Sequence, residues 1–145
     1  MFKNILIATD GSQLSERAAL NAVRLAKSIS ARLTAITVST PFHVFTTDAV
    51  MVTDTEDVYK KECDARAAKY LGVIKNAAES AGLTFEGIHV FRDHPYAAII
   101  DTADKEGCDA ICMASHGRRG IAALVLGSET MKVLTHSKIP VVVWR

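Results

Sequence analysis

Residues 5–38 decide the fold, and they read ILIATDGSQLSERAALNAVRLAKSISARLTAITV. The β-branched apolar run Ile5–Ala8 comes first, and the turn-forming Asp10-Gly11-Ser12 follows it at once. A second β-branched run occupies Leu33–Val38. Between the two runs, apolar residues recur at helical spacing, at Ala18, Ala22, Leu25 and Ile29. The order predicts a strand, a turn, a helix capped by Ser12 or Ser15, and a second strand, which is a βαβ unit.

The rest of the chain continues the same alternation. After a predicted loop at Ser39–Thr53, helices are expected from about Asp54 to Ala81, from Pro95 to Gly107, and from an N-cap at Ser128 to about His136. Strands are expected at Phe85–Phe91, Ala110–Met113 and Pro140–Val143. The inner face of the longest helix is predicted at Val58, Ala65, Ala68, Leu71, Ile74, Ala78 and Ala81. Strands that alternate with helices predict an α/β fold, a doubly wound five-stranded parallel sheet with helices on both faces. We expect one domain over residues 1–145.

Composition excludes several classes of protein. The formal net charge is +1, whereas duplex-binding proteins carry a large positive excess, so no nucleic acid partner is expected. No apolar run reaches the ~20 residues of a membrane span, and Asp10 ends the first apolar run too early for a signal peptide. The three cysteines form no CxxC pair and are predicted to be buried and structural, which fits a cytoplasmic protein. The five histidines show no metal-ligand spacing, so no metal site is expected.

Ligand chemistry is expected at the carboxyl ends of the first and fourth strands, if these strands are neighbours at the point where strand order reverses. Gly117-Arg118-Arg119-Gly120, followed by Gly127-Ser128, offers glycines, two cations and a helix start, which together suit a phosphate group. The alternative is a tight loop followed by an ordinary helix cap. Asp10 suits a ribose hydroxyl or a metal ion, with a simple turn residue as the alternative. The chain has neither a P-loop ending nor a GxGxxG after its first strand, and no catalytic set is evident.

The sequence resembles the universal stress protein family along essentially its whole length. The resemblance rests on residues 2–12, on Met113–Gly120, on Leu126-Gly127-Ser128 and on the ending Ile139–Val143. It implies a five-stranded parallel sheet of order 3-2-1-4-5, similar to adenine-nucleotide α-hydrolases. It also implies a homodimer through the last strand, formed by Pro140, Val141, Val142, Val143 and Trp144.

One branch of that family binds ATP through Gly, two residues, Gly, nine residues, Gly and then Ser or Thr. Here the first position is Ala114, and Gly117, Gly127 and Ser128 fill the others. Alanine keeps the site if its φ is negative, since it adds only a methyl group. The resemblance implies that ATP, with or without Mg²⁺, would be bound by Ala8, Thr9, Asp10, Val38, Met113, Ala114, His116, Gly117, Arg118, Arg119, Gly127, Ser128, Glu129 and Thr130. Among these, Glu129 would compete with phosphate unless its carboxylate points outward.

Together with the resemblance, which alone implies the stress-response role, these observations predict a cytoplasmic protein that binds an adenine nucleotide as a switch or sensor, with no efficient catalysis. Its protein partner is not identified by the sequence. One alternative is a stress protein that binds no nucleotide and works through protein contacts. A second alternative is a slow ATPase or a phosphotransferase.

Overall fold

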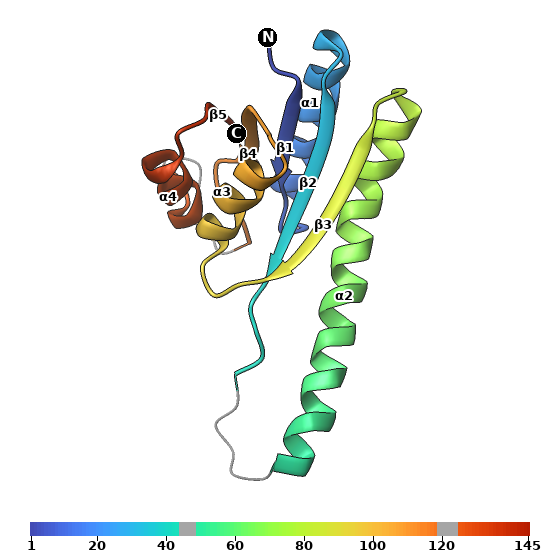
Figure 1. Cartoon of the computed structure of the whole chain (residues 1–145), viewed down its shortest axis with the longest axis vertical. Helices are drawn as coiled ribbons and strands as arrows, with labels where there is room; N and C mark the ends of the chain where they lie inside the picture. Colours follow the sequence, from blue (N-terminus) through green and yellow to red (C-terminus); the bar gives the residue numbers. More distant parts are fainter. Residues whose placement is uncertain (44–48, 119–124) are drawn as a thin grey trace.

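The predicted alternation of strands and helices is present in the computed structural model, which describes residues 1–43, 49–118 and 125–145, with backbone only at 49–54. The strands are β1 (Asn4–Ala8), β2 (Arg32–Ser39), β3 (Phe85–Phe91), β4 (Ala110–Ala114) and β5 (Val141–Trp144). The helices are α1 (Gln13–Ile29), α2 (Ala49–Ser80), α3 (Pro95–Lys105) and α4 (Ser128–His136). All strands are parallel, in the order β3-β2-β1-β4-β5, so the predicted fold class is confirmed (Figure 1).

The centre of the sheet is β1, which pairs with β2 on one side and β4 on the other. Ile7 lies opposite Ala35 of β2 and Cys112 of β4. Every residue of β1 and β4 is buried, because helices cover both faces at this point. That burial explains why these strands read as continuous apolar runs rather than as an alternation of polar and apolar residues.

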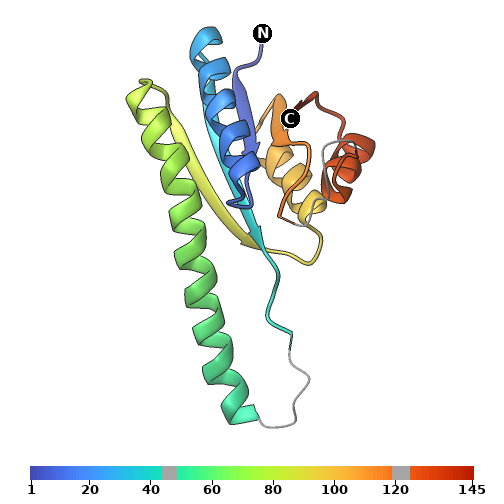
Figure 2. The ribbon, with the colours of Figure 1, turned by 180° about the vertical axis from the view of Figure 1, so that it is seen from behind.

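Two helices cover each face of the sheet. Helices α1 and α2 pack on one face, and α3 and α4 pack on the other (Figures 1 and 2). The first face is built around Ile5, Ile7 and Leu33, and the second around Leu6 and Ile111, so successive residues of β1 point to opposite cores. This arrangement follows from right-handed crossovers, with the winding reversed after β3.

The turn between β1 and α1 forms as its sequence predicts. Ser12 is the N-cap of α1, and its side chain accepts a hydrogen bond from the backbone N–H of Ser15. Gly11 has a φ of +75°, a conformation that side chains with a β-carbon rarely adopt. The β1–α1 turn is therefore held by one glycine and one cap.

One prediction for α2 is wrong, and another is confirmed only in part. The helix begins at Ala49 rather than near Asp54, since residues 49–54 contain neither glycine nor proline to stop it. Of the predicted inner face, Ile74 and Ala78 are buried, and Leu71 and Ala81 pack partly buried against the same core. The other three predicted residues, Val58, Ala65 and Ala68, are exposed, and Cys63 and Ala67 are buried in their place. Alanine suits both a core and an exposed helix surface, so its spacing did not fix the face. Residues 44–48 of the predicted loop lie outside the described residues.

The ends of the last two elements differ slightly from the prediction. The N-cap of α4 is Gly127, without a side-chain cap bond, and Ser128 is the first residue inside the helix. Strand β5 begins at Val141, one residue after Pro140, and it lies at an edge of the sheet as expected. The cysteines are buried and unpaired as expected, and burial raises the pKa of the Cys112 thiol to about 11.

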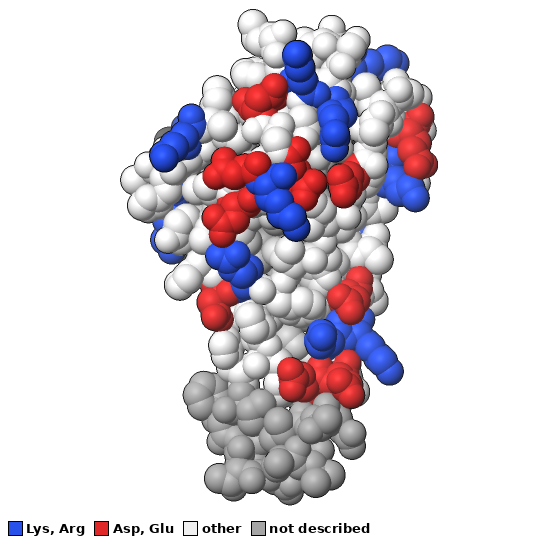
Figure 3. Space-filling model, viewed as in Figure 1, with Lys and Arg blue, Asp and Glu red and all other residues white. Residues whose placement is uncertain are grey.

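Charges of both signs are interspersed over the face of the molecule seen in Figure 3. Within the described ranges, no helix combines the length and the apolar character that crossing a bilayer requires.

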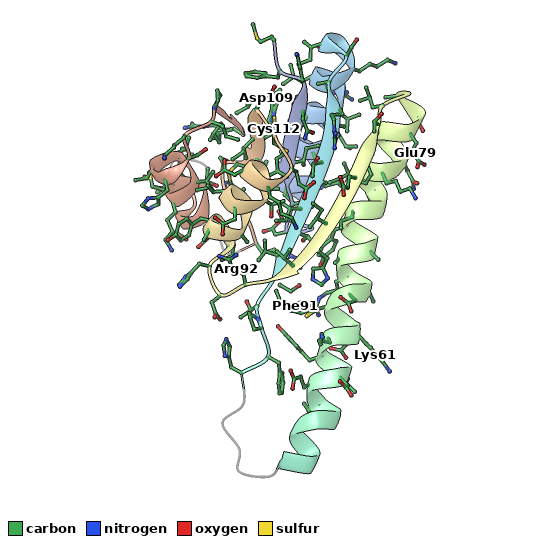
Figure 4. All side chains as sticks on the ribbon, viewed as in Figure 1. Lys61, Glu79, Phe91, Arg92, Asp109 and Cys112 are labelled. Atoms are coloured by element: carbon green, nitrogen blue, oxygen red, sulfur yellow. The ribbon has the colours of Figure 1, made fainter. Side chains whose placement is uncertain are left out.

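A hydrogen-bonded chain of three side chains joins α2 to the edge of the sheet, and no sequence pattern predicts it. His89 of β3 lies with Nε2 2.8 Å from the Ser39 Oγ of β2 and with Nδ1 2.9 Å from the Asp64 Oδ1 of α2. Its ring also packs against Phe91, with centroids 4.7 Å apart. In Figure 4, Phe91 projects from β3 toward α2. Because the His89 side chain is only 14% exposed, its hydrogen bonds are partly shielded from water.

Replacement of His89 by alanine should lower the free energy of unfolding by about 1–3 kcal/mol, since two hydrogen bonds and a ring contact are lost. Urea denaturation measures this change. The control is Lys61→Ala, at an exposed residue of α2, which should stay within about 0.5 kcal/mol of wild type. Equal stability of the two variants would show that the chain of hydrogen bonds does not anchor α2.

Candidate functional site

A cavity of about 470 Å³ lies at the carboxyl ends of the strands, on the side of the sheet that α3 and α4 cover. Residues from the ends of β1, β2 and β4 form its floor, and the starts of α3 and α4 form its walls. A cavity of this size is within the usual range for small-molecule sites. Its position is where doubly wound sheets bind ligands.

Thirteen of the predicted site residues line this one cavity: Ala8, Thr9, Asp10, Val38, Met113, Ala114, His116, Gly117, Arg118, Gly127, Ser128, Glu129 and Thr130. The fourteenth, Arg119, lies outside the described residues. The cavity also contains six residues that the sequence reasoning missed, namely Ser15, Ile36, Thr40, Asp93, Pro95 and Ile99. Most of these come from the ends of β2 and β3 or from α3, so the rule that all strand ends share one rim would have indicated their region.

The start of α4 supplies hydrogen-bond donors to the cavity. The first-turn amides of Ser128, Glu129 and Thr130 have no acceptor within the helix. The amide of Gly127 is already used, because it donates to the Ser115 carbonyl over 2.7 Å. Thr130 is buried, and its hydroxyl donates to the Ala114 carbonyl over 2.9 Å, which fixes the helix against β4. The helix therefore presents the positive end of its dipole to the cavity.

Backbone geometry explains which glycines the loop requires. Ala114 is the last residue of β4 and does not have a positive φ, so alanine fits where the family pattern has glycine. At Gly117, a β-carbon would overlap the carboxylate of Asp10. At Gly127, a β-carbon would lie 3.0 Å from the Cα of His116. A side chain at Gly117 would thus displace the Asp10 carboxylate, and one at Gly127 would press on the His116 backbone, while Ala114 carries no such constraint.

The carboxylate of Asp10 binds one backbone amide from each of two loops. Its Oδ1 accepts from the Ser12 N–H over 3.0 Å, and its Oδ2 accepts from the Arg118 N–H over 2.9 Å. The Arg118 Nε also donates to the Asp10 carbonyl over 2.9 Å. Burial alone would raise the pKa of Asp10, but the hydrogen bonds together outweigh it and hold the pKa below its usual value. Asp10 is therefore a charged brace between the β1–α1 and β4–α4 loops.

Glu129 has its carboxylate engaged by the neighbouring helix. Its Oε2 accepts from the backbone N–H of Tyr96, in the first turn of α3, over 2.8 Å. Its Oε1 lies 3.4 Å from the Nζ of Lys132. The donors that surround this carboxylate offset its charge, so repulsion of an anion in the cavity is reduced.

A doubly wound sheet with a polar cavity at its strand ends and a helix N-terminus in the wall is the arrangement in which α/β proteins commonly bind small ligands. A model of the universal stress protein family matches residues 1–145, and the chain belongs to that family. The "universal stress protein in QAH/OAS sulfhydrylase 3'region" of Thermus aquaticus is 31% identical over 145 residues, covering all of both chains. Universal stress protein YxiE of Bacillus subtilis is 31% identical over 149 residues, again covering all of both chains.

Solved structures of similar proteins share the fold. The structure of protein MJ0577, from Methanocaldococcus jannaschii, has a TM-score of 0.82 and 30% identity, and the match covers 99% of this chain and 95% of that one. A universal stress protein in complex with cAMP has a TM-score of 0.71 and 28% identity, with coverage of 99% and 97%.

The lowered pKa of Asp10 makes a prediction about acid stability. The unfolded chain binds a proton at Asp10 near pH 4, and the folded chain binds it only at lower pH. The stabilising contribution is therefore present above about pH 4 and is lost as the pH falls through the folded-state pKa. Asp10→Asn should lose less unfolding free energy between pH 5 and pH 3 than wild type, measured by urea denaturation at each pH. An identical loss of unfolding free energy in both proteins would show that the charged Asp10 carboxylate does not stabilise the fold.

Proposed function

We propose that this chain is a cytoplasmic stress-response protein that binds ATP as a switch or sensor and acts through a protein partner. The observation that carries the proposal is the meeting of the α4 first-turn amides with Gly117 and Asp10 in one cavity. A similar protein has been solved in complex with cAMP, which shares its adenosine part with ATP, and this supports an adenine nucleotide.

In the proposed complex, each part of ATP has a chemical match in the cavity. Ala8 and Val38 offer apolar contacts to the adenine, and Asp10 offers carboxylate oxygens to the ribose. The backbone from Ala114 to Ser128 would hold the phosphates, assisted by the Ser128 hydroxyl and Arg118. Mg²⁺ commonly binds through phosphates and few protein ligands, so it would enter with the nucleotide.

Binding without efficient turnover is proposed because the carboxylates of the cavity have other partners. Asp10 accepts two backbone amides, and Glu129 accepts from Tyr96. The third, Asp93, lies 2.8 Å from the Nε2 of His43. A general base must reach a water molecule beside the phosphate, and these engaged carboxylates are poorly suited to that role.

Wild type should bind ATP in calorimetric titration, and Gly127→Val should abolish binding. A branched side chain at Gly127 would press on the backbone of His116 and occupy the space in front of the α4 amides. Ser128→Ala should weaken binding by about ten- to a hundredfold, because one hydrogen bond to a charged group is worth roughly 1.5–3 kcal/mol.

Gly72→Val is the matched control for this experiment, since a β-carbon at Gly72 meets open space. It should bind ATP like wild type, and circular dichroism should show that all variants are folded. Absence of saturation by wild type up to millimolar ATP would refute nucleotide binding and favour the alternative of protein contacts alone.

We also propose that β5 is the homodimer contact, over residues Pro140, Val141, Val142, Val143 and Trp144. Strand β5 is an edge of the sheet, and its four residues are half-buried and apolar. An apolar edge strand is prone to pair with another strand unless it is covered. Val141 and Val142 pack against the two cores, whereas Val143 packs against neither core among the described residues.

Val143→Lys should convert a dimer into a monomer in sedimentation velocity, because a charge at the edge opposes strand pairing. Val143 is the appropriate position, since the change spares the core contacts of its neighbours. The control is Val58→Lys on the exposed part of α2, which should remain dimeric. A wild-type monomer at micromolar concentration would refute the proposed contact.

A further inference from the structure

A second cavity, of about 340 Å³, lies between α1, α2 and the start of the loop after β4. Val73 and Ile74 of α2 give it an apolar floor, while its other walls are polar or charged. Thr9 and Arg118 line both this cavity and the larger one. The two cavities are therefore neighbours, separated by the contact between Asp10 and Arg118.

Three cations converge on this second cavity. Arg66 and Lys69 come from one face of α2, and Arg118 comes from a loop 49 residues farther along the chain than Lys69. Glu16 is the one acidic residue among the described residues that line it. Three positive charges against one negative charge leave a net excess that an anion would neutralise.

Within the described part of the chain, Arg66 and Lys69 lack the ion pair with a carboxylate that four other Lys or Arg residues form. Arg32, Arg92 and Lys75 each form an ion pair, with Glu86, Asp101 and Glu79 respectively. In contrast, Lys69 forms no ion pair with a described residue, and the hydrogen bond of the Arg66 guanidinium goes to the Cys63 sulfur over 3.3 Å. Lys69 and Arg66 thus retain hydrogen-bonding capacity that a ligand can use.

Tyr70 and Gly11 set the position of Arg118. The Nη2 of Arg118 donates to the Tyr70 hydroxyl over 2.6 Å, and its guanidinium lies 5.3 Å from the centre of the Tyr70 ring. The ring packs so closely on Gly11 that a β-carbon there would overlap it. Because the Tyr70 oxygen accepts from Arg118, its own proton is free to be donated to a ligand.

We propose that this second cavity binds a phosphate group, either inorganic phosphate or that of a small metabolite, separately from the nucleotide. Arg66, Lys69 and Tyr70 supply donors, and Arg118 supplies a fixed planar cation. The volume is at the low end for ligand sites, which favours a small anion over a second nucleotide.

The proposal is tested by titrating the ¹⁵N-labelled protein with inorganic phosphate and, separately, with glycerol 3-phosphate, while following backbone amide shifts. Saturable shifts are expected at Gly11 and Tyr70. Lys69→Gln should weaken binding by about tenfold or more, as expected for loss of a hydrogen bond between charged groups. The matched control is Lys61→Gln, at a lysine that projects from α2 into solvent in Figure 4, and it should bind like wild type. Tighter binding of glycerol 3-phosphate than of phosphate would identify a metabolite as the source.

The Gly127→Val variant separates this proposal from nucleotide binding, because that substitution lies in the other cavity. The shifts at Gly11 and Tyr70 should persist in it, even if ATP binding is lost or was never present. Shifts confined to Ser128, an absence of saturable shifts, or equal weakening by Lys69→Gln and Lys61→Gln would each overturn the second site.

Discussion

The contact between Asp10 and Arg118 joins the loops that follow β1 and β4, at the point where the winding of the sheet reverses. Strands β1 and β4 are neighbours, but the chain leaves β1 toward α1 and leaves β4 toward α4, on opposite faces. Two loops that diverge in this way leave backbone amides without partners at the end of the sheet. The Asp10 carboxylate accepts one amide from each loop, and Gly117 is required because any larger residue would displace that carboxylate. The cavity at the carboxyl ends of the strands is therefore organised around this half-buried charge.

The contact between Asp10 and Arg118 separates the two cavities, and Arg118 lines both of them. Its backbone N–H and its Nε hold Asp10, while its Nη2 reaches Tyr70 on the far side. Negative charge in either cavity therefore acts on a cation whose position is fixed from both sides. An arginine held by three hydrogen bonds loses less freedom on binding an anion than a solvated one would, which favours recognition of phosphate groups on either side.

The sequence predicted the features that depend on local pattern and failed where distant residues meet. Runs of β-branched residues and turn chemistry located all five strands and the Ser12 cap, and the phosphate-loop motif located one cavity wall. Three of the seven residues predicted for the buried face of α2 are exposed, because alanines occur on both faces of the helix. The N-cap of α4 is Gly127 rather than Ser128. Arg118 and Tyr70 are 48 positions apart, and His89 lies 25 positions from Asp64 and 50 from Ser39. No periodicity in the sequence encodes such distant pairs.

Ser115 connects the two surfaces that the proposed function uses. Its carbonyl accepts from the Gly127 N–H over 2.7 Å, at the start of α4, and its own N–H donates to the Trp144 carbonyl over 2.8 Å, at the end of β5. The N-cap of the helix that faces the proposed phosphates and the end of the strand proposed to form the dimer are thus both hydrogen-bonded to Ser115. Coupling between sites requires an element that both sites bias. Ser115 is such a candidate element, since a shift of α4 toward a phosphate would act on a residue that is also hydrogen-bonded to the end of β5.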